Sequence, residues 1–157
     1  MRKIKTFWSL DSELKRMLLE AYVLLAKARI MKKRSFRKIA PALGVQREET
    51  SFYMSNEEQK TAQKISFAVH TASRFTFWES ACLVKAIAAQ KMLHKRGIET
   101  TLYLGTGKNE EGKFIAHAWL RSGPLYVTGA EGMERFTVVS HFAKFQNKEG
   151  IRGGATS

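Results

Sequence analysis

The first apolar stripe of the chain runs at helical spacing through residues 10–28. Its members recur every three or four positions and would line one broad face of a helix. Ser9 or Asp11 can cap the start of this helix, which we expect to end near Met31. The stripe is typical of a helix face that packs into a protein core rather than of a face that meets a membrane.

Proline and glycine divide the segment after this helix. A basic connector leads to Ser35, which can start a short helix through Ile39. Pro41 and Gly44 are expected to end that helix, because proline lacks an amide donor and glycine suits a helix C-terminus. Residues 45–54 are polar and predict a loop.

Two further helices have recognisable starts. Ser55 and Glu58 have the spacing of a capping box, in which each side chain bonds the other residue's backbone amide. We expect the helix that they open to fade near Arg74. The next helix is predicted to begin with Ser80 as its cap, which makes Cys82 its second residue.

Beyond residue 100 the apolar spacing changes from helical to alternating. The pattern predicts strands at residues 101–104, 114–120, 125–128 and 136–139, and a turn-rich loop at 105–112. His141 follows the last of these strands and is expected to be structural. The predicted fold class is therefore α+β, with N-terminal helices and a small antiparallel sheet packed on the helix that starts at Cys82.

The composition bounds the size of the protein and its metal chemistry. The chain has 157 residues and one cysteine, which fits a single domain and excludes an intramolecular disulfide or a Cys-rich zinc site. No ligand cluster predicts a metal or another cofactor. Within the domain we expect a basic helical preface (1–54), a core (55–146) and a flexible tail (147–157).

Positive charge is concentrated in the first third of the chain. The net charge is +13, and residues 1–50 hold 13 Lys or Arg against five Asp or Glu. Such a field attracts polyanions or an acidic protein partner. The cluster lacks interleaved aromatics and a recognition module, which weakens the case for nucleic acid. No apolar run is long enough to span a bilayer, so we expect a soluble, cytoplasmic protein with a free thiol.

Cys82 and His117 form the candidate catalytic pair. A thiol in the first turn of a helix meets free backbone amides and the positive end of the helix dipole, and both stabilise the thiolate. His117 lies in the predicted strand at 114–120, on the same face as Trp119. A histidine that takes the thiol proton and returns it to a leaving amine completes the machinery of a cysteine peptidase or acyl transferase.

A third group is expected to orient the histidine. With a two-residue turn at Ser122-Gly123, the register places Thr128 directly across from His117. Glu131, just past the return strand, and Glu79, three residues before the cysteine, are the acidic alternatives. Thr128 ranks first by register and Glu131 ranks next by chemistry.

Each member of the pair also has a purely structural interpretation. Cysteine is often a buried packing residue, and a histidine in a central strand is often a hydrogen-bonded core residue. The chain could then be a basic module that binds nucleic acid or protein without catalysis. The placement of both residues, at a helix start and in a central strand, favours the catalytic pair.

Four segments resemble a known family. Residues 78–86 (Trp-Glu-Ser-Ala-Cys-Leu-Val-Lys-Ala), 95–98 (Lys-Arg-Gly-Ile), 116–120 (Ala-His-Ala-Trp-Leu) and 127–129 (Val-Thr-Gly) are similar to the leader peptidase of lasso-peptide biosynthesis. That family has a transglutaminase-like, papain-type fold. The resemblance covers roughly residues 60–145, and stand-alone members carry a similar helical preface.

The resemblance implies an activity and partners. The enzyme would cleave the leader from a ribosomally made precursor peptide, which a small recognition protein delivers, before a separate ATP-dependent cyclase acts. Cys82 would be the nucleophile and His117 the general base and acid, with Trp78 and Trp119 as candidate substrate contacts. The family pattern expects an acidic or amide residue as the third member, where this chain has Thr128. Another papain-like amidase or acyl transferase is the alternative enzyme.

Overall fold

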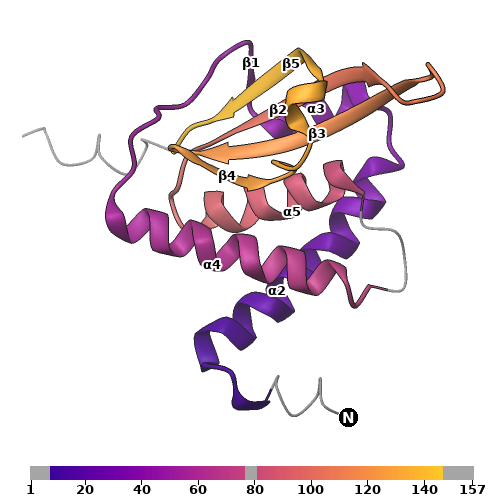
Figure 1. Ribbon diagram of the computed structural model, residues 1–157. Coiled ribbons are helices and arrows are strands. Elements are labelled where there is room, and N and C mark those ends of the chain that lie inside the picture. The colour runs from indigo at the N-terminus through magenta and orange to yellow at the C-terminus, as the bar shows by residue number, and fades with distance from the viewer. Residues whose placement is uncertain (1–7, 77–80, 147–157) are drawn as a thin grey trace, which may run out of the picture.

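The computed structural model describes residues 8–76 and 81–146, in which helices pack against an antiparallel sheet. The helices are α2 (Ser12–Lys32), α3 (Phe36–Leu43), α4 (Asn56–Ser73) and α5 (Cys82–Lys95). The strands are β1 (Val45–Gln46), β2 (Thr100–Lys108), β3 (Phe114–Ser122), β4 (Leu125–Thr128) and β5 (Thr137–Lys144). Their order in the sheet is β1-β5-β2-β3-β4. A short 3₁₀ helix, η1 (Met133–Arg135), precedes β5. Helices α2, α4 and α5 lie together along one side of the sheet (Figure 1). The predicted α+β class is confirmed.

The predicted helix starts agree with the structure where capping is local. Asp11 is the N-cap of α2. The capping box of α4 is complete, because the Glu58 amide donates to Ser55 Oγ over 3.2 Å and the Ser55 amide donates to Glu58 Oε2 over 3.1 Å. Each of these starts depends on residues within one helical turn, which the sequence displays directly.

The sequence expectation for residues 35–54 was wrong in two respects. Helix α3 continues to Leu43 with Pro41 inside it. Pro41 has no amide hydrogen to donate to the Arg37 carbonyl, four residues earlier. Both residues are exposed, so water can bond that carbonyl instead. Residues 45–54 are also not all loop, because β1 pairs with the end of β5, almost a hundred residues away.

The predicted loop at residues 105–112 is shorter than expected. Strand β2 continues through Gly105 and Gly107 to Lys108, and these glycines serve close packing rather than a turn. A Cβ atom on Gly105 would lie 2.9 Å from the Trp119 ring, and one on Gly107 would lie 2.9 Å from a backbone oxygen. The last strand is likewise longer than predicted, so His141 lies inside β5 rather than after it.

The predicted pairing of His117 with Thr128 was also wrong. Gly123 and Pro124 separate β3 from β4, and a register shift between Leu120 and Arg121 places Thr128 opposite Leu120. The turn lies one residue later than predicted, which alone would pair Thr128 with Trp119, and the shift then adds one unpaired residue to the ladder.

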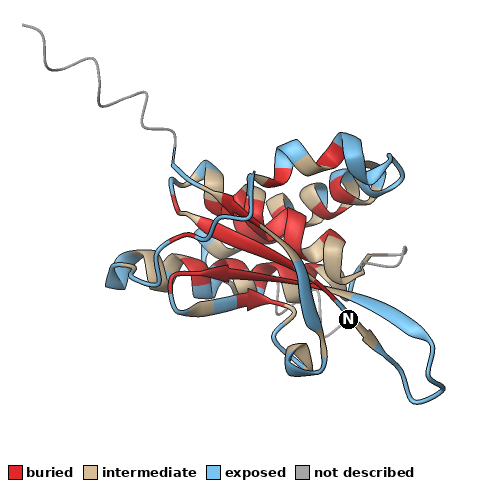
Figure 2. Cartoon of the chain, turned by 90° about the horizontal axis from the view of Figure 1, so that it is seen from above, coloured by how far each residue is buried: buried red, intermediate tan, exposed pale blue. Residues whose placement is uncertain are grey.

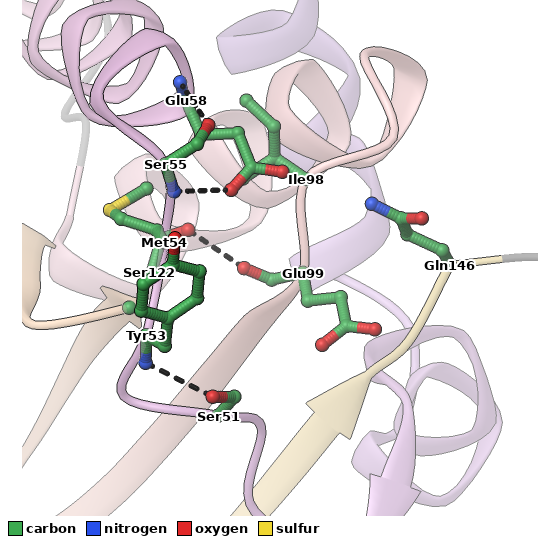
Figure 3. A pocket seen from close by; sticks show the side chains of 10 residues that line it. Ser51, Tyr53, Met54, Ser55, Glu58, Ile98, Glu99, Ser122 and Gln146 are labelled. Carbon is green, nitrogen blue, oxygen red and sulfur yellow. Dashed lines mark hydrogen bonds between the residues drawn. The ribbon is translucent and has the colours of Figure 1, made fainter.

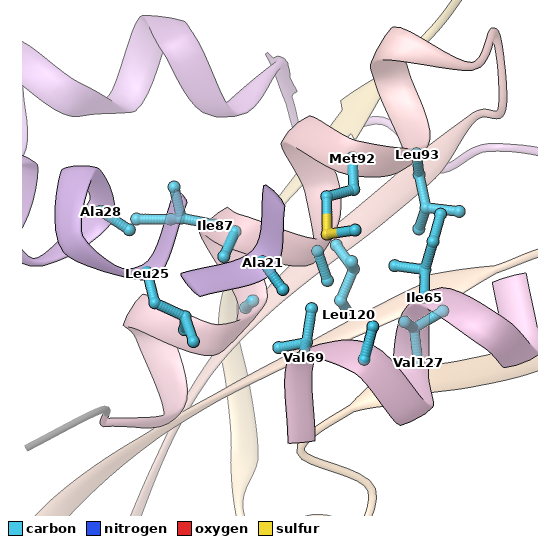
Figure 4. Close-up of a cluster of buried hydrophobic side chains, with 14 of the residues drawn as sticks. Ala21, Leu25, Ala28, Ile65, Val69, Ile87, Met92, Leu93, Leu120 and Val127 are labelled. Atoms are coloured by element: carbon cyan, nitrogen blue, oxygen red, sulfur yellow. The ribbon is translucent and has the colours of Figure 1, made fainter. Parts of the chain in front are cut away.

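One apolar core joins the helices to the sheet. Figure 4 shows side chains from α2, α4, α5, β3 and β4 meeting between the helices and the strands. Leu25, Ile65, Ile87 and Leu120 are all less than 2% exposed. Seen from above, burial runs through the middle of the sheet, whereas the β2–β3 hairpin projects into solvent (Figure 2). Helix α2 thus contributes to the same core as the segments after residue 54.

Glu20 of α2 fixes one end of the antiparallel pair formed by α2 and α5. Its carboxylate accepts from Arg96 over 2.7 Å, and Lys95 lies 3.7 Å away. The hydrogen bond from Arg96 lowers the pKa of Glu20, and the charge of the same arginine adds to the effect.

This lowered pKa predicts how stability depends on pH. A carboxyl whose pKa is lower in the folded than in the unfolded state stabilises the fold at pH values above its unfolded pKa, which is about 4.3. This contribution is lost as the pH falls through the folded pKa. The free energy of unfolding of the wild type should therefore fall more steeply with acid below that pH than that of Glu20→Gln. Urea unfolding curves between neutral pH and pH 3 measure both slopes. Equal slopes would contradict the assignment.

Candidate functional site

Cys82 is the first residue of α5, one position earlier than expected. Ala81 is the N-cap and its carbonyl accepts the first helical bond, from the Lys85 amide over 3.0 Å. Ser80, the expected cap, lies outside the described residues, as do Trp78 and Glu79. Ala81 provides no side-chain cap, and the amides of a helix's first turn have no partner within the helix. The half-buried thiol of Cys82 therefore lies beside donors that can stabilise a thiolate.

His117 is held in one tautomer by a backbone carbonyl. Its Nε2 atom lies 2.7 Å from the oxygen of Gly129. A carbonyl oxygen only accepts, so Nε2 carries the hydrogen and the neutral ring keeps its lone pair on Nδ1. The ring also lies 4.8 Å from the Phe136 ring and 5.7 Å from that of Trp119, measured between centroids. These contacts orient the imidazole and leave Nδ1 as the nitrogen with a free lone pair.

Gly129 can hold this position because it lacks a side chain. Its φ is +74°, in the left-handed region, and a Cβ atom would lie 2.4 Å from the Ala118 carbonyl oxygen. The glycine follows β4 directly, which lets its carbonyl turn toward His117. Sequence reasoning missed this residue because it searched for a side-chain acceptor. The one available signal was a glycine directly after the return strand.

The other candidates for the third group lie elsewhere. Thr128 is buried opposite Leu120, and its hydroxyl has no hydrogen-bond partner. Glu131 is exposed, and no hydrogen bond among the described residues joins it to His117. Trp119, a candidate substrate contact, is 5% exposed and stacks on Tyr103 at 5.6 Å. Its remaining surface is small, so its closest relation to the site is its contact with the His117 ring.

Cys82 and His117 come from neighbouring elements, because α5 packs against β3. Alternation places His117 on the strand face of Trp119, opposite the face through which Leu120 joins the helical core. In the described part of the chain no hydrogen bond links the thiol to the imidazole. Strand β4 pairs with β3 only up to Leu120, so the segment of β3 that carries His117 has an edge that β4 leaves unpaired.

Substituting Gly129 with alanine should release His117. The added Cβ would collide with the Ala118 carbonyl, and the Gly129 oxygen would move away from Nε2. We expect the ¹⁵N chemical shifts of the imidazole to change from one dominant Nε2–H tautomer to a mixture, and any activity that uses His117 as a base to fall about 10- to 100-fold. Gly112→Ala is the control, because Gly112 also has a positive φ but nothing within 4 Å of its Cβ position. An unchanged tautomer ratio in Gly129→Ala would refute the assignment.

Two cavities lie near the ends of α5. The first, about 370 Å³, lies beyond the C-terminal end of the helix, and its walls include Tyr53, Glu58, Glu99 and Gln146 (Figure 3). The second, about 250 Å³, lies beside the first turn of α5 and is lined by Val84 and three cations of α2. Among the residues that the structure describes, neither a metal-binding cluster of His, Cys, Asp or Glu nor a helix suited to cross a membrane occurs.

Comparison with known proteins identifies the family. The model of the transglutaminase-like superfamily matches residues 22–141, most of the chain, and includes both Cys82 and His117. Searches of curated proteins and of solved structures found no match. The superfamily includes papain-like cysteine peptidases and acyltransferases, and its domains are typically enzymes. The matched segment and the helix-on-sheet architecture agree, and the chain belongs to the transglutaminase-like superfamily.

Proposed function

We propose that this protein is a cysteine peptidase that removes the leader from a ribosomally made lasso-peptide precursor. The observation that carries the proposal is the 2.7 Å bond from His117 to the Gly129 carbonyl, which leaves Nδ1 as the basic atom on a strand that packs against the Cys82 helix. The substrate assignment rests on the four segments around Trp78, Lys95, His117 and Thr128 that resemble the leader peptidases.

The proposed reaction uses both residues twice. His117 Nδ1 accepts the Cys82 proton, and the thiolate attacks the scissile carbonyl carbon to form a tetrahedral intermediate. Free amides in the first turn of α5 are suited to stabilise the oxyanion. The imidazolium then protonates the leaving amine as the C–N bond breaks and leaves a thioester. Water, deprotonated by the same imidazole, attacks the thioester, releases the leader as a carboxylic acid and restores the thiol.

The neutral acceptor has an electrostatic consequence. A carboxylate beside the histidine would stabilise the imidazolium through its full charge, whereas the Gly129 carbonyl offers only a dipole. We therefore infer that the carbonyl mainly fixes the tautomer of His117. The helix amides then make the larger contribution to stabilising the thiolate that forms when Cys82 transfers its proton.

We infer a meeting point for the two side chains from their places in the fold. His117 lies on the strand face away from the helical core, and α5 begins on the side of the molecule toward which the β2–β3 hairpin projects (Figure 1). We place the contact between Cys82 Sγ and His117 Nδ1 at the edge of β3 that β4 leaves unpaired beyond Leu120. A peptide would approach the part of this edge that precedes Ala118, because Gly129 lies against Ala118 and Trp119.

The proposed partners follow from the substrate. A small recognition protein would hold the leader and deliver it, and an ATP-dependent cyclase would use the freed core peptide. The basic preface offers a docking surface for an acidic leader or delivery protein, whose binding would then weaken as salt rises. A reducing cytoplasm suits the single free thiol, and we place the enzyme there.

The test is a processing assay. The protein is incubated with a lasso precursor and its delivery protein, and the products are identified by mass spectrometry. One cut that separates leader from core is the expected result. Transfer of an acyl group to an added amine without that cut would support the acyl transferase instead. Tight, steeply salt-dependent binding of an oligonucleotide without any cleavage would support the binding module.

A further inference from the structure

A basic pocket lies between the last turn of α2 and the first turn of α5. It encloses about 250 Å³, and its walls include Arg29, Lys32 and Lys33 from the end of α2 and Val84 from α5. Val84 follows Cys82 by two residues, a rise of about 3 Å along the helix axis. Two residues are also about 200° apart around the axis, so the pocket lies at the same level of α5 as the thiol but on another face of the helix.

The two ends of the α2–α5 pair differ in charge balance. At the C-terminal end of α5, the Glu20 carboxylate neutralises Arg96 and lies near Lys95. At the N-terminal end, the ion pairs of residues 8–76 and 81–146 include neither Lys32 nor Lys33. Both lysines are exposed. Within the described segments, Glu20 thus balances positive charge at the far end of α5, whereas no ion pair neutralises Lys32 or Lys33.

Neighbouring lysines increase the positive field. Lys91 of α5 reaches across to Met31 of α2, with 3.2 Å between its Nζ and the sulfur. Burial lowers the pKa of Lys91, and the charge of Lys27 lowers it further. Burial and the charge of Lys91 lower the pKa of Lys144 in turn. Lys27 therefore repels Lys91, and Lys91 repels Lys144, in addition to the effect of burial.

We propose that this pocket is a subsite for an aspartate or glutamate side chain of the peptide that Cys82 cleaves. The inference deepens the proposed function, since it assigns an acidic residue close to the scissile bond. Lys32 and Lys33 supply the charge, and the 250 Å³ cavity is large enough for a carboxymethyl or carboxyethyl group. The carboxylate also gains from the free amides at the start of α5.

Amide NMR tests the pocket without requiring catalysis. The probes are two acetylated and amidated peptides, Gly-Glu-Glu-Gly and Gly-Gln-Gln-Gly, titrated into the ¹⁵N-labelled protein. We expect the Glu peptide to shift the amides of Lys32, Lys33 and Val84, and the Gln peptide to leave them unmoved. The Lys32→Gln/Lys33→Gln variant should lose this response. The Lys60→Gln/Lys108→Gln variant removes the same charge from exposed positions elsewhere and should keep it.

Alkylation of the single cysteine tests whether the pocket acts on Cys82. Iodoacetate carries a carboxylate and iodoacetamide does not, so the ratio of their rates reports the local attraction for an anion. We expect Lys32→Gln/Lys33→Gln to lower the ratio about threefold at low salt, and the control variant to change it much less. These measurements need no precursor, so a failed processing assay would leave the pocket result intact.

Three outcomes would overturn the subsite. Equal shifts with the Glu and Gln peptides would show that the carboxylate is not what binds. An equal alkylation ratio in the two double variants would show that the pocket does not act on the thiol. An octathymidylate probe could also shift the amides of Lys32, Lys33 and Val84 more strongly than the Glu peptide does, with both probes at the same total concentration of negative charge. That result would assign the surface to nucleic acid.

Discussion

Replacing Cys82 with alanine is expected to lower kcat/KM for leader removal by at least about a thousandfold. The reaction that we propose forms a thioester on this sulfur, and the chain has no second cysteine to replace it. Alanine removes the nucleophile and leaves α5 intact, because the helix is held by buried residues such as Ile87, Met92 and Leu93. Progress curves followed by mass spectrometry measure the loss.

His117→Gln is the matched variant for the base. Glutamine retains an N–H group that can donate to the Gly129 carbonyl, but it has no basic nitrogen. We expect a loss of similar size in this variant, and little further loss when it is combined with Cys82→Ala, because the two residues act as a unit. Thermal unfolding should show that both variants remain folded. Processing by Cys82→Ala at the wild-type rate would end the catalytic interpretation.

Replacing Arg121 with alanine is expected to destabilise the fold by about 3–5 kcal/mol. Its side chain is 0% exposed, on the face of the sheet opposite the helical core. The guanidinium donates to the carbonyl oxygens of Thr50, Ser51 and Gly123 over 2.8–3.2 Å, and to the hydroxyls of Tyr103 and Thr101 over 3.0 and 3.3 Å. Alanine would leave these carbonyls without their donor, at about 1–3 kcal/mol for each buried group.

Urea unfolding measures this effect, and Arg37→Ala is its control. Arg37 is exposed on α3, and its loss should change the free energy of unfolding by less than about 0.5 kcal/mol. Arg121→Lys keeps the charge but loses the planar fork, so an intermediate loss is expected. A change below about 1 kcal/mol in Arg121→Ala would show that water replaces the guanidinium at low cost.

The two sets of substitutions separate chemistry from folding. Cys82 and His117 are half-buried at the site, and their variants should lose activity before stability. Arg121 ties the segment around Thr50 to the sheet, and its variant should lose stability first. Activity measured at a temperature well below unfolding keeps these effects distinct.

Several features could be predicted from the sequence because their causes are local. The capping box of Ser55 and Glu58 involves residues three apart, and the apolar stripe that became α2 depends only on helical spacing. The change to alternating spacing after residue 100 indicated the sheet, and with the helices it gave the α+β class. The place of Cys82 in the first turn of α5 was also predicted, to within one residue, from the neighbouring residues that are typical of helix ends.

The features that failed depend on distant parts of the chain. Strand β1 exists because Val45 pairs with Ala143, and neither segment alone indicates a strand there. Two of the carbonyls that bind Arg121, those of Thr50 and Ser51, come from a loop about seventy residues earlier. A sequence shows that an arginine alternates onto a strand face, but not that backbone carbonyls will surround it.

The third group of the site shows the same division. Sequence alone determined the helix that presents Cys82 and the strand that carries His117. Tertiary structure decided the register: the turn at Gly123-Pro124 and the shift at Leu120 together moved Thr128 away from His117, and the left-handed turn at Gly129 brought a carbonyl to Nε2. Backbone acceptors occur at every residue, so only the path of the folded chain selects the one that meets the histidine.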